Sequence, residues 1–378
     1  MHTLSLFDDL VLDAPPTEGI KYAGSKLKLI PHILQLVKKV DAKSVWDGFS
    51  GTTRVSQALA KSGYRVISSD IAVWSEVFGT CYLLNNKRPE EYQALIDHLN
   101  AVAPMDGWFT EFYGGQPNEG CAIQSDGLKK PWQIHNTRKL DGIRQEIDAL
   151  HLEKVEKAVA LTSLILALDQ VDSSLGHFVS YLKDWAPRSY NDLTLRVPKV
   201  FVADQEHEVY RADVMNLVPL ISADVAYFDP PYGSNNDKMP PSRVRYASYY
   251  HVWTSICLFD KPELFGKARR RADTSDTAAA SVFEDFRKDH EGIFVAVAAI
   301  EQLIKTTNSR WIVLSYSSGG RATANELCDV MRRHGRVIEV VELDYKKNVM
   351  AAMKWTNEWL RDAEEPNREF IFLIDKQA

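Results

Sequence analysis

The sequence has few cysteines, no long apolar run and no basic leader, and each absence excludes a class of protein. Its four cysteines lie far apart and form no CxxC pair, so we expect neither a disulfide framework nor a zinc site. Residues 1–18 lack the basic segment and apolar core of a signal peptide, and no later run is long enough to span a bilayer. We therefore expect a cytoplasmic protein without membrane contact.

An excess of positive charge is also missing, because the formal net charge is -6. Nucleic-acid binding would then need a local basic surface on an acidic body. Residues 233–271 could form one, since they hold eight Lys or Arg against three acids. The hydrophobic content of 45% and the charged content of 25% are ordinary for a globular protein, and 378 residues suffice for one large domain or two.

A strand, a glycine turn and a helix are predicted from residue 45 onward, as at the opening of a Rossmann-like unit. The turn contains Asp47, Phe49 and Gly51 but lacks the GxGxxG pattern of a dinucleotide site. A nucleoside ligand without a pyrophosphate fits this turn better. Asp70 ends the next predicted strand, close to the spacing at which an acid reaches ribose hydroxyls.

The apolar residues 225–228 predict a short buried strand that ends in Asp229, Pro230, Pro231 and Tyr232. The prolines cannot continue a sheet ladder, so the strand stops there. Asp229 and Tyr232 then lie at the carboxyl end of a buried strand, where open α/β sheets bind their ligands. An ordinary strand end is the alternative.

The rest of the chain alternates helices and strands in the manner of an α/β fold. We assign 19–99 and 201–378 to one catalytic domain and 100–200 to a mostly helical insertion. Residues 233–290 are read as a long polar loop region of the catalytic domain, and a loop of that length is usually functional. The last predicted strand, 369–374, is expected to pair antiparallel with 336–343 at a sheet edge.

Taken in order, these segments resemble the alpha-group, Dam-like DNA adenine-N6 methyltransferases. The similar segments are K-Y-A-G-S-K at 21–26, D-G-F-S-G at 47–51, the acid at 70, residues 136–144, Asp213, the D-P-P-Y tetrapeptide at 229–232 and residues 314–320. Tyr22 replaces the family's usual Trp, and Ser25 replaces its second Gly. The resemblance implies a Rossmann-like, mostly parallel methyltransferase sheet with an antiparallel edge strand and a helical target-recognition insertion.

The resemblance also implies S-adenosylmethionine as cofactor and no metal. Asp70 would accept from the ribose hydroxyls, Asp213 would meet the adenine amine, and Lys26 and Asp47 would face the amino-acid end. The full set of implied cofactor contacts is Tyr22, Lys26, Asp47, Phe49, Gly51, Asp70, Ile71, Asp213 and Asp229. In catalysis the Asp229 carboxylate and the Pro230 carbonyl would accept the hydrogens of the target amine, and Tyr232 would stack on a flipped adenine.

Double-stranded DNA is the implied partner, with a cognate restriction endonuclease as a possible second one. Tyrosines 246, 249 and 250 and His251 are expected to stack on unstacked bases, with plain loop packing as the alternative. The candidate DNA contacts are Arg188, Arg196, Arg243, Arg245 and Tyr249. We expect a monomeric, site-specific enzyme of bacterial or phage origin.

Other functions remain open at this point. A cytosine-N4 methyltransferase uses the same acceptor geometry, and methylation of RNA or of a protein amide is a further alternative. Outside the enzymes, the chain could be a catalytically silent DNA-binding subunit.

Overall fold

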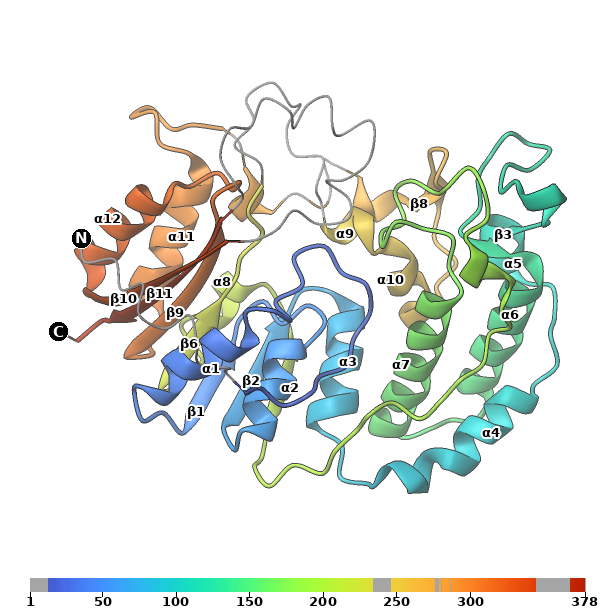
Figure 1. The fold of residues 1–378 in the computed structure, drawn as a ribbon, viewed down its shortest axis with the longest axis horizontal. Coiled ribbons are helices and arrows are strands. Elements are labelled where there is room, and N and C mark those ends of the chain that lie inside the picture. The colour runs from blue at the N-terminus through green and yellow to red at the C-terminus, as the bar shows by residue number, and fades with distance from the viewer. Residues whose placement is uncertain are drawn as a thin grey trace.

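The computed structural model of the chain describes residues 13–233, 246–275, 279, 281–285, 287–344 and 368–377. Its centre is a seven-stranded sheet with the strand order β10-β11-β9-β6-β1-β2-β5 (Figure 1). The strands are β1 (Ser44–Asp47), β2 (Arg65–Asp70), β5 (Glu208–Arg211), β6 (Val225–Phe228), β9 (Trp311–Ser317), β10 (Arg336–Asp344) and β11 (Arg368–Asp375). Of these strands, β1, β2, β6, β10 and β11 were predicted from the sequence.

The central strands are parallel, as predicted. β1 lies between β2 and β6, and β9 continues the parallel set beside β6. β11 is antiparallel to both β9 and β10, which confirms the expected antiparallel pairing. β10 is the outermost strand, so the antiparallel strand lies one position inside the edge. The carboxyl ends of β1, β2 and β6 consequently meet along one edge of the sheet.

Helices cover both faces of this sheet because successive strand residues point to opposite sides. Trp46 and Leu314 pack on one face with Ile300 of α11 (Val295–Thr306), and α8 (Val214–Leu217) and α12 (Ala324–His334) belong to the same layer. Val45 and Tyr227 pack on the other face with α1 (Ile30–Lys38) and α2 (Arg54–Lys61). β6 is therefore buried along its whole length, as its apolar run predicts.

A helical unit lies beside the sheet, at the right of Figure 1. It contains α4 (Gln93–Ala101), α5 (Trp108–Tyr113), α6 (Ile134–Ala149) and α7 (Lys154–Gln170), and it joins the sheet through α3 (Val73–Leu83). The basic side chains of α6 turn partly inward. Arg144 is 1% exposed, and its Nε donates to the Ile256 carbonyl at 2.6 Å.

The prediction of a long unstructured loop over 233–290 is wrong for the described residues of that range. They form α9 (Tyr246–Tyr249), α10 (His251–Leu258) and a hairpin of β7 (Leu264–Phe265) and β8 (Arg270–Arg271). α10 packs inside the helical unit and is buried on almost every side, so it lacks the polar stripe that reveals a surface helix. Pairing between short strands cannot be read from composition.

The remaining elements are short, namely β3 (Gly114–Gly115), β4 (Trp132–Gln133) and the 3-10 turns Pro89–Tyr92, Asn118–Gly120, Pro187–Tyr190, Ala272–Thr274 and Val282–Glu284. Across the described ranges, no helix is both long and apolar enough to cross a membrane.

Candidate active site and cofactor pocket

A cavity of about 580 Å³ opens where the carboxyl ends of β1, β2 and β6 meet. This volume is within the usual range for small-molecule and cofactor sites. All nine residues predicted to bind the cofactor line the cavity, together with Pro230 and Tyr232. Sequence positions from 22 to 232 are thus gathered in one place, and their contacts with a ligand stay predictions.

The glycine turn after β1 is built around a left-handed residue. Gly51 has a φ of +46°, and its N–H donates to Asp70 Oδ2 at 2.8 Å. The other carboxylate oxygen of Asp70 accepts from the Ala72 N–H at 2.8 Å. A Cβ at Gly51 would come within 3.3 Å of the Tyr22 hydroxyl, so the turn and the opposite wall are in close contact. The N–H groups of Gly51 and Ala72 together fix the direction of the Asp70 carboxylate.

Asp47 ends β1 with a buried carboxylate that is only half satisfied. Its Oδ2 accepts from Ser56 Oγ at 2.6 Å, whereas Oδ1 makes no hydrogen bond to any described residue. Burial raises its pKa to about 7, although the bond from Ser56 and the nearby N–H of Phe49 act in the opposite direction. A buried acceptor without a donor costs free energy, so a cationic ligand group fits here.

The D-P-P-Y corner is organised by the ammonium of Lys26. Lys26 is 7% exposed, and its Nζ donates to the Tyr232 hydroxyl. The same Nζ lies 3.7 Å from Asp229 Oδ2 and 3.7 Å from Glu369 Oε2. Burial raises the pKa of Asp229 well above its usual range, and Lys26 opposes that shift. The predicted role of Lys26 toward the cofactor carboxylate stays a prediction, because its ammonium faces Asp229, Tyr232 and Glu369 in this structure.

Glu369 is a member of this corner that the sequence analysis missed. It is buried in β11, at the strand end that faces the pocket, and accepts from the Tyr232 hydroxyl at 3.4 Å. The only available signal in the sequence was that the acid Glu369 directly precedes the apolar run 370–374.

The main chain after Pro231 is held by the turn that follows β9. The Tyr232 carbonyl accepts from the Arg321 N–H at 2.9 Å and from the Tyr316 hydroxyl at 3.3 Å. The Tyr232 and Tyr316 rings also pack, with centroids 4.7 Å apart. Gly233 follows with a φ of +63°, which an L side chain adopts only with strain. Tyr316, in the segment 314–320 that was singled out in the sequence, therefore supports the loop that carries Asp229 and Tyr232.

One wall of the pocket is aromatic. Tyr22 stacks on Tyr250 with centroids 4.7 Å apart, and Tyr246 lies 5.4 Å from Tyr22. Of the four residues expected to stack on bases, only Tyr246 lines the pocket. Tyr250 and His251 are fully buried, as the packing alternative expects. Tyr249 is also buried and packs on His177 at 4.8 Å, so its DNA contact stays a prediction.

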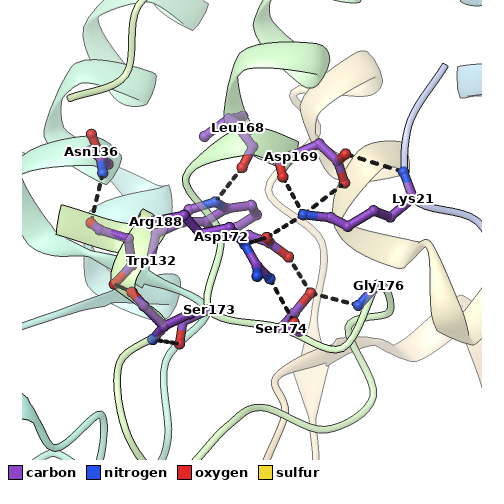
Figure 2. Close-up of polar contacts among 12 residues, drawn as sticks. Lys21, Trp132, Asn136, Leu168, Asp169, Asp172, Ser173, Ser174, Gly176 and Arg188 are labelled. Carbon is purple, nitrogen blue, oxygen red and sulfur yellow. Dashed lines mark hydrogen bonds and ion pairs between the residues drawn. The ribbon is translucent and has the colours of Figure 1, made fainter. Parts of the chain in front are cut away.

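The two described arginines proposed for DNA contact have partners within the chain. Arg188 Nε donates to Asp172 Oδ1 at 2.9 Å, in the network of Figure 2. Arg196 forms an ion pair with the buried carboxylate of Glu18. Neither arginine lines the pocket. Their DNA contacts stay predictions, and Arg243 and Arg245 lie outside the described residues.

Comparison with known proteins assigns this chain to a family. Residues 22–278 match the model of the D12 class N6 adenine-specific DNA methyltransferases. The chain belongs to this family. The assignment confirms the resemblance predicted from the motifs, and the family's target base is adenine rather than cytosine. Family membership also implies the use of S-adenosylmethionine in general terms.

In the described parts of the chain, no cluster of three or more His, Cys, Asp or Glu is arranged to hold a metal ion.

The proteins similar to this chain include modification methylases and type II methyltransferases of bacteria. The chain is 28% identical over 345 residues to Modification methylase StsI of Streptococcus sanguinis, covering 87% of this chain and 48% of that protein. It is 26% identical over 343 residues to Modification methylase LlaI of Lactococcus lactis subsp. lactis, covering 87% and 51%. Type II methyltransferase M.NlaIII of Neisseria lactamica is 23% identical over 337 residues, covering 87% and 92%. The chain thus spans about half the length of the first two relatives.

Proposed function

We propose that this chain is a site-specific DNA methyltransferase that moves a methyl group from S-adenosylmethionine to the N6 amine of an adenine flipped out of duplex DNA. The observation that carries the proposal is the shared cavity. It places the half-satisfied carboxylate of Asp47, the fixed carboxylate of Asp70 and the Asp229 corner around one space. Membership of the adenine-specific family supports the choice of base.

The pocket residues fit S-adenosylmethionine, which supplies an electrophilic methyl group when bound. Asp47 Oδ1 needs a donor, and an α-ammonium provides one. Asp70 keeps lone pairs for ribose hydroxyls after accepting from two backbone N–H groups. Ile71 is 69% exposed at the lip of the cavity, and such an exposed apolar side chain suits the face of an adenine ring. Asp213 is exposed there too, with Oδ1 engaged by the Met215 N–H.

The catalytic proposal follows from acceptors fixed at the end of β6. An exocyclic amine conjugated with its ring is a weak nucleophile, so acceptors that bind its hydrogens help to localise the lone pair on nitrogen. Asp229 and the carbonyl of Pro230 provide two such acceptors, and proline has no N–H that would compete for them. Tyr232, held by Lys26 and by the turn after β9, offers a ring on which a flipped base can stack.

DNA recognition is assigned to the helical unit of 100–200 and to residues 233–290. The arginines 188, 196, 243 and 245 and Tyr249 are the proposed contacts with the duplex. We also propose that the protein acts as a monomer in the bacterial or phage-infected cytoplasm, beside a cognate restriction endonuclease. The relatives described above are modification methylases and type II methyltransferases, which supports that context.

The test is methylation of duplex DNA by the purified protein with methyl-labelled S-adenosylmethionine. Digestion to nucleosides and mass spectrometry should show N6-methyladenine, and modification-sensitive sequencing should place it at one short site. Asp229→Ala should reduce the rate at least about a hundredfold, as losses of single transition-state contacts do. Asp329→Ala, which alters a side chain 66% exposed on α12, is the matched control. N4-methylcytosine, or no modified base, would overturn the proposal.

A separate binding measurement distinguishes an enzyme from a silent subunit. Calorimetry should show S-adenosylmethionine binding to the wild type and to Asp229→Ala. Asp70→Ala should bind at least about tenfold more weakly, because one lost charge-assisted contact is worth about 1.4 kcal/mol or more. Unchanged binding by Asp70→Ala would refute the cofactor assignment.

A further inference from the structure

Glu369 is a buried acid in a strand that otherwise supplies core side chains. It is 6% exposed, pairs in register with Ser317 of β9, and lies outside the residues that match the family. A buried carboxylate is costly unless other groups bind it. The identity of those groups shows why an acid occupies this position.

The partners of Glu369 are the residues of the catalytic corner. The Tyr232 hydroxyl accepts from Lys26 Nζ and donates to Glu369 Oε2 at 3.4 Å. Lys26 Nζ lies 3.7 Å from Glu369 Oε2 and 3.7 Å from Asp229 Oδ2. One ammonium therefore stands between two carboxylates at equal distances, with the phenol joining the ammonium to one of them.

We propose that Glu369 is a positioning residue for the reaction, which holds the Tyr232 hydroxyl and divides the Lys26 ammonium between itself and Asp229. The inference rests on the proposed function, and it assigns a role to a residue beyond the family's motifs. Tyr232 is restrained at both ends, since its hydroxyl is bound by Lys26 and Glu369 and its carbonyl by Arg321 and Tyr316. Such restraint fixes the ring against which a base would stack.

Sharing of the ammonium determines how readily Asp229 ionises. Burial raises the Asp229 pKa most, Lys26 lowers it, and Glu369 raises it through like-charge repulsion. The other titratable groups that face Asp229 are Asp47 of β1, Asp70 of β2, Tyr227 of β6, Tyr22 and Tyr232. Without the Glu369 charge, the Lys26 ammonium would interact with Asp229 alone, and the pKa of Asp229 would fall. Without Lys26, the two carboxylates would face each other and the pKa would rise.

This balance bears on the reaction because N6 must release one proton when it gains a methyl group. An ionised Asp229 can accept a hydrogen bond, and then a proton, on either oxygen. A protonated Asp229 has one oxygen occupied by its own hydrogen. The rate should therefore rise with pH as Asp229 ionises, and the position of that rise reports the charge around it.

The experiment is a pH–rate profile of single-turnover methylation with saturating DNA and S-adenosylmethionine. Glu369→Gln should move the acidic limb down by about half to one pH unit, and Lys26→Met should move it up by about one unit or more. Glu339→Gln, on the neighbouring strand β10 and paired with Lys39, is the control and should keep the wild-type limb. A purely structural role for Glu369 would lower the rate at all pH values without moving the limb.

The outcomes separate this inference from the proposed function. If the wild type methylates DNA but Glu369→Gln leaves the limb in place, the role of Glu369 is refuted. If the wild type methylates nothing, the proposed function itself fails. Should Glu369→Gln not fold, as judged by circular dichroism, Glu369→Ala takes its place. This variant also removes the charge, so a downward shift of the limb by about half a unit or more supports the proposal and a limb at the wild-type position overturns it.

Discussion

Replacing Asp172 should destabilise the junction between the helical unit and the pocket wall. Asp172 follows the carboxyl end of α7 and is 1% exposed (Figure 2). Its Oδ1 accepts from Lys21 Nζ at 2.7 Å and from Arg188 Nε at 2.9 Å, and Ser174 Oγ donates to Oδ2. Asp172→Ala removes the acceptor for all three donors at once.

The expected loss follows from these contacts. A hydrogen bond to a charged group contributes about 1.5–3 kcal/mol, so the three bonds to Asp172 set an upper bound of about 9 kcal/mol. The Lys21 and Arg188 side chains are 39% and 37% exposed, so water can replace much of what they lose. We therefore expect Asp172→Ala to lower the free energy of unfolding by about 2–3 kcal/mol. Asp172→Asn keeps one acceptor oxygen and should cost about 1 kcal/mol.

Urea unfolding followed by circular dichroism is the assay. With a slope of about 3 kcal/mol per molar urea, the midpoint of Asp172→Ala should fall by about 0.7–1 M. Asp192→Ala is the control, since its carboxylate is 91% exposed and lies 3.7 Å from His135, and it should cost under about 0.5 kcal/mol. A midpoint for Asp172→Ala within about 0.2 M of wild type would refute the reasoning. Equal losses in the two variants would do the same.

Two further predictions concern the pocket and the core. Gly51→Ala should weaken S-adenosylmethionine binding about tenfold in calorimetry, since it strains a left-handed residue and pushes on the Tyr22 hydroxyl. Gly63→Ala, also at positive φ but with open space around it, should leave binding unchanged, and equal effects would contradict this reading. Burial lowers the pKa of His251 to about 3, so its neutral form is favoured in the folded state, where it bonds to the Phe178 carbonyl. Stability from this group is complete above pH 6.5 and is lost as pH falls toward 3, by up to about 1.4 kcal/mol per pH unit. Because the raised pKa of Asp47 shifts stability in the opposite direction, the check compares the change in urea midpoint between pH 7 and 5 in the wild type and in His251→Gln, and equal changes in the two would disprove it.

Much of the sheet and pocket could be predicted because the signals are local. The apolar run Val225–Phe228 followed by two prolines defines a strand and its end without reference to the rest of the chain. Asp47 and Asp70 mark the ends of β1 and β2 in the same local way. Since parallel strands end at one edge, Asp47, Asp70 and Asp229 could be placed together before their distances were known.

The partners of charged side chains could not be predicted in the same way. Arg188 and Arg196 look like available cations in the sequence, yet they bind Asp172 and Glu18. No periodicity links such residues, because the contacts depend on how separate elements pack. Glu369 escaped notice for the same reason, and α10 was missed because burial on nearly all sides removes the amphipathic pattern.

The position of β11 has a consequence for how the protein is made. β10 forms its sheet hydrogen bonds only with β11 among the described strands, and β11 pairs on its other side with β9. On the ribosome, β9 and β10 are therefore synthesised before the strand that joins them, and each presents an unpaired edge until β11 emerges. Glu369 enters with β11, so the cluster of Lys26, Tyr232 and Glu369 is complete only after β11 has joined the other described strands.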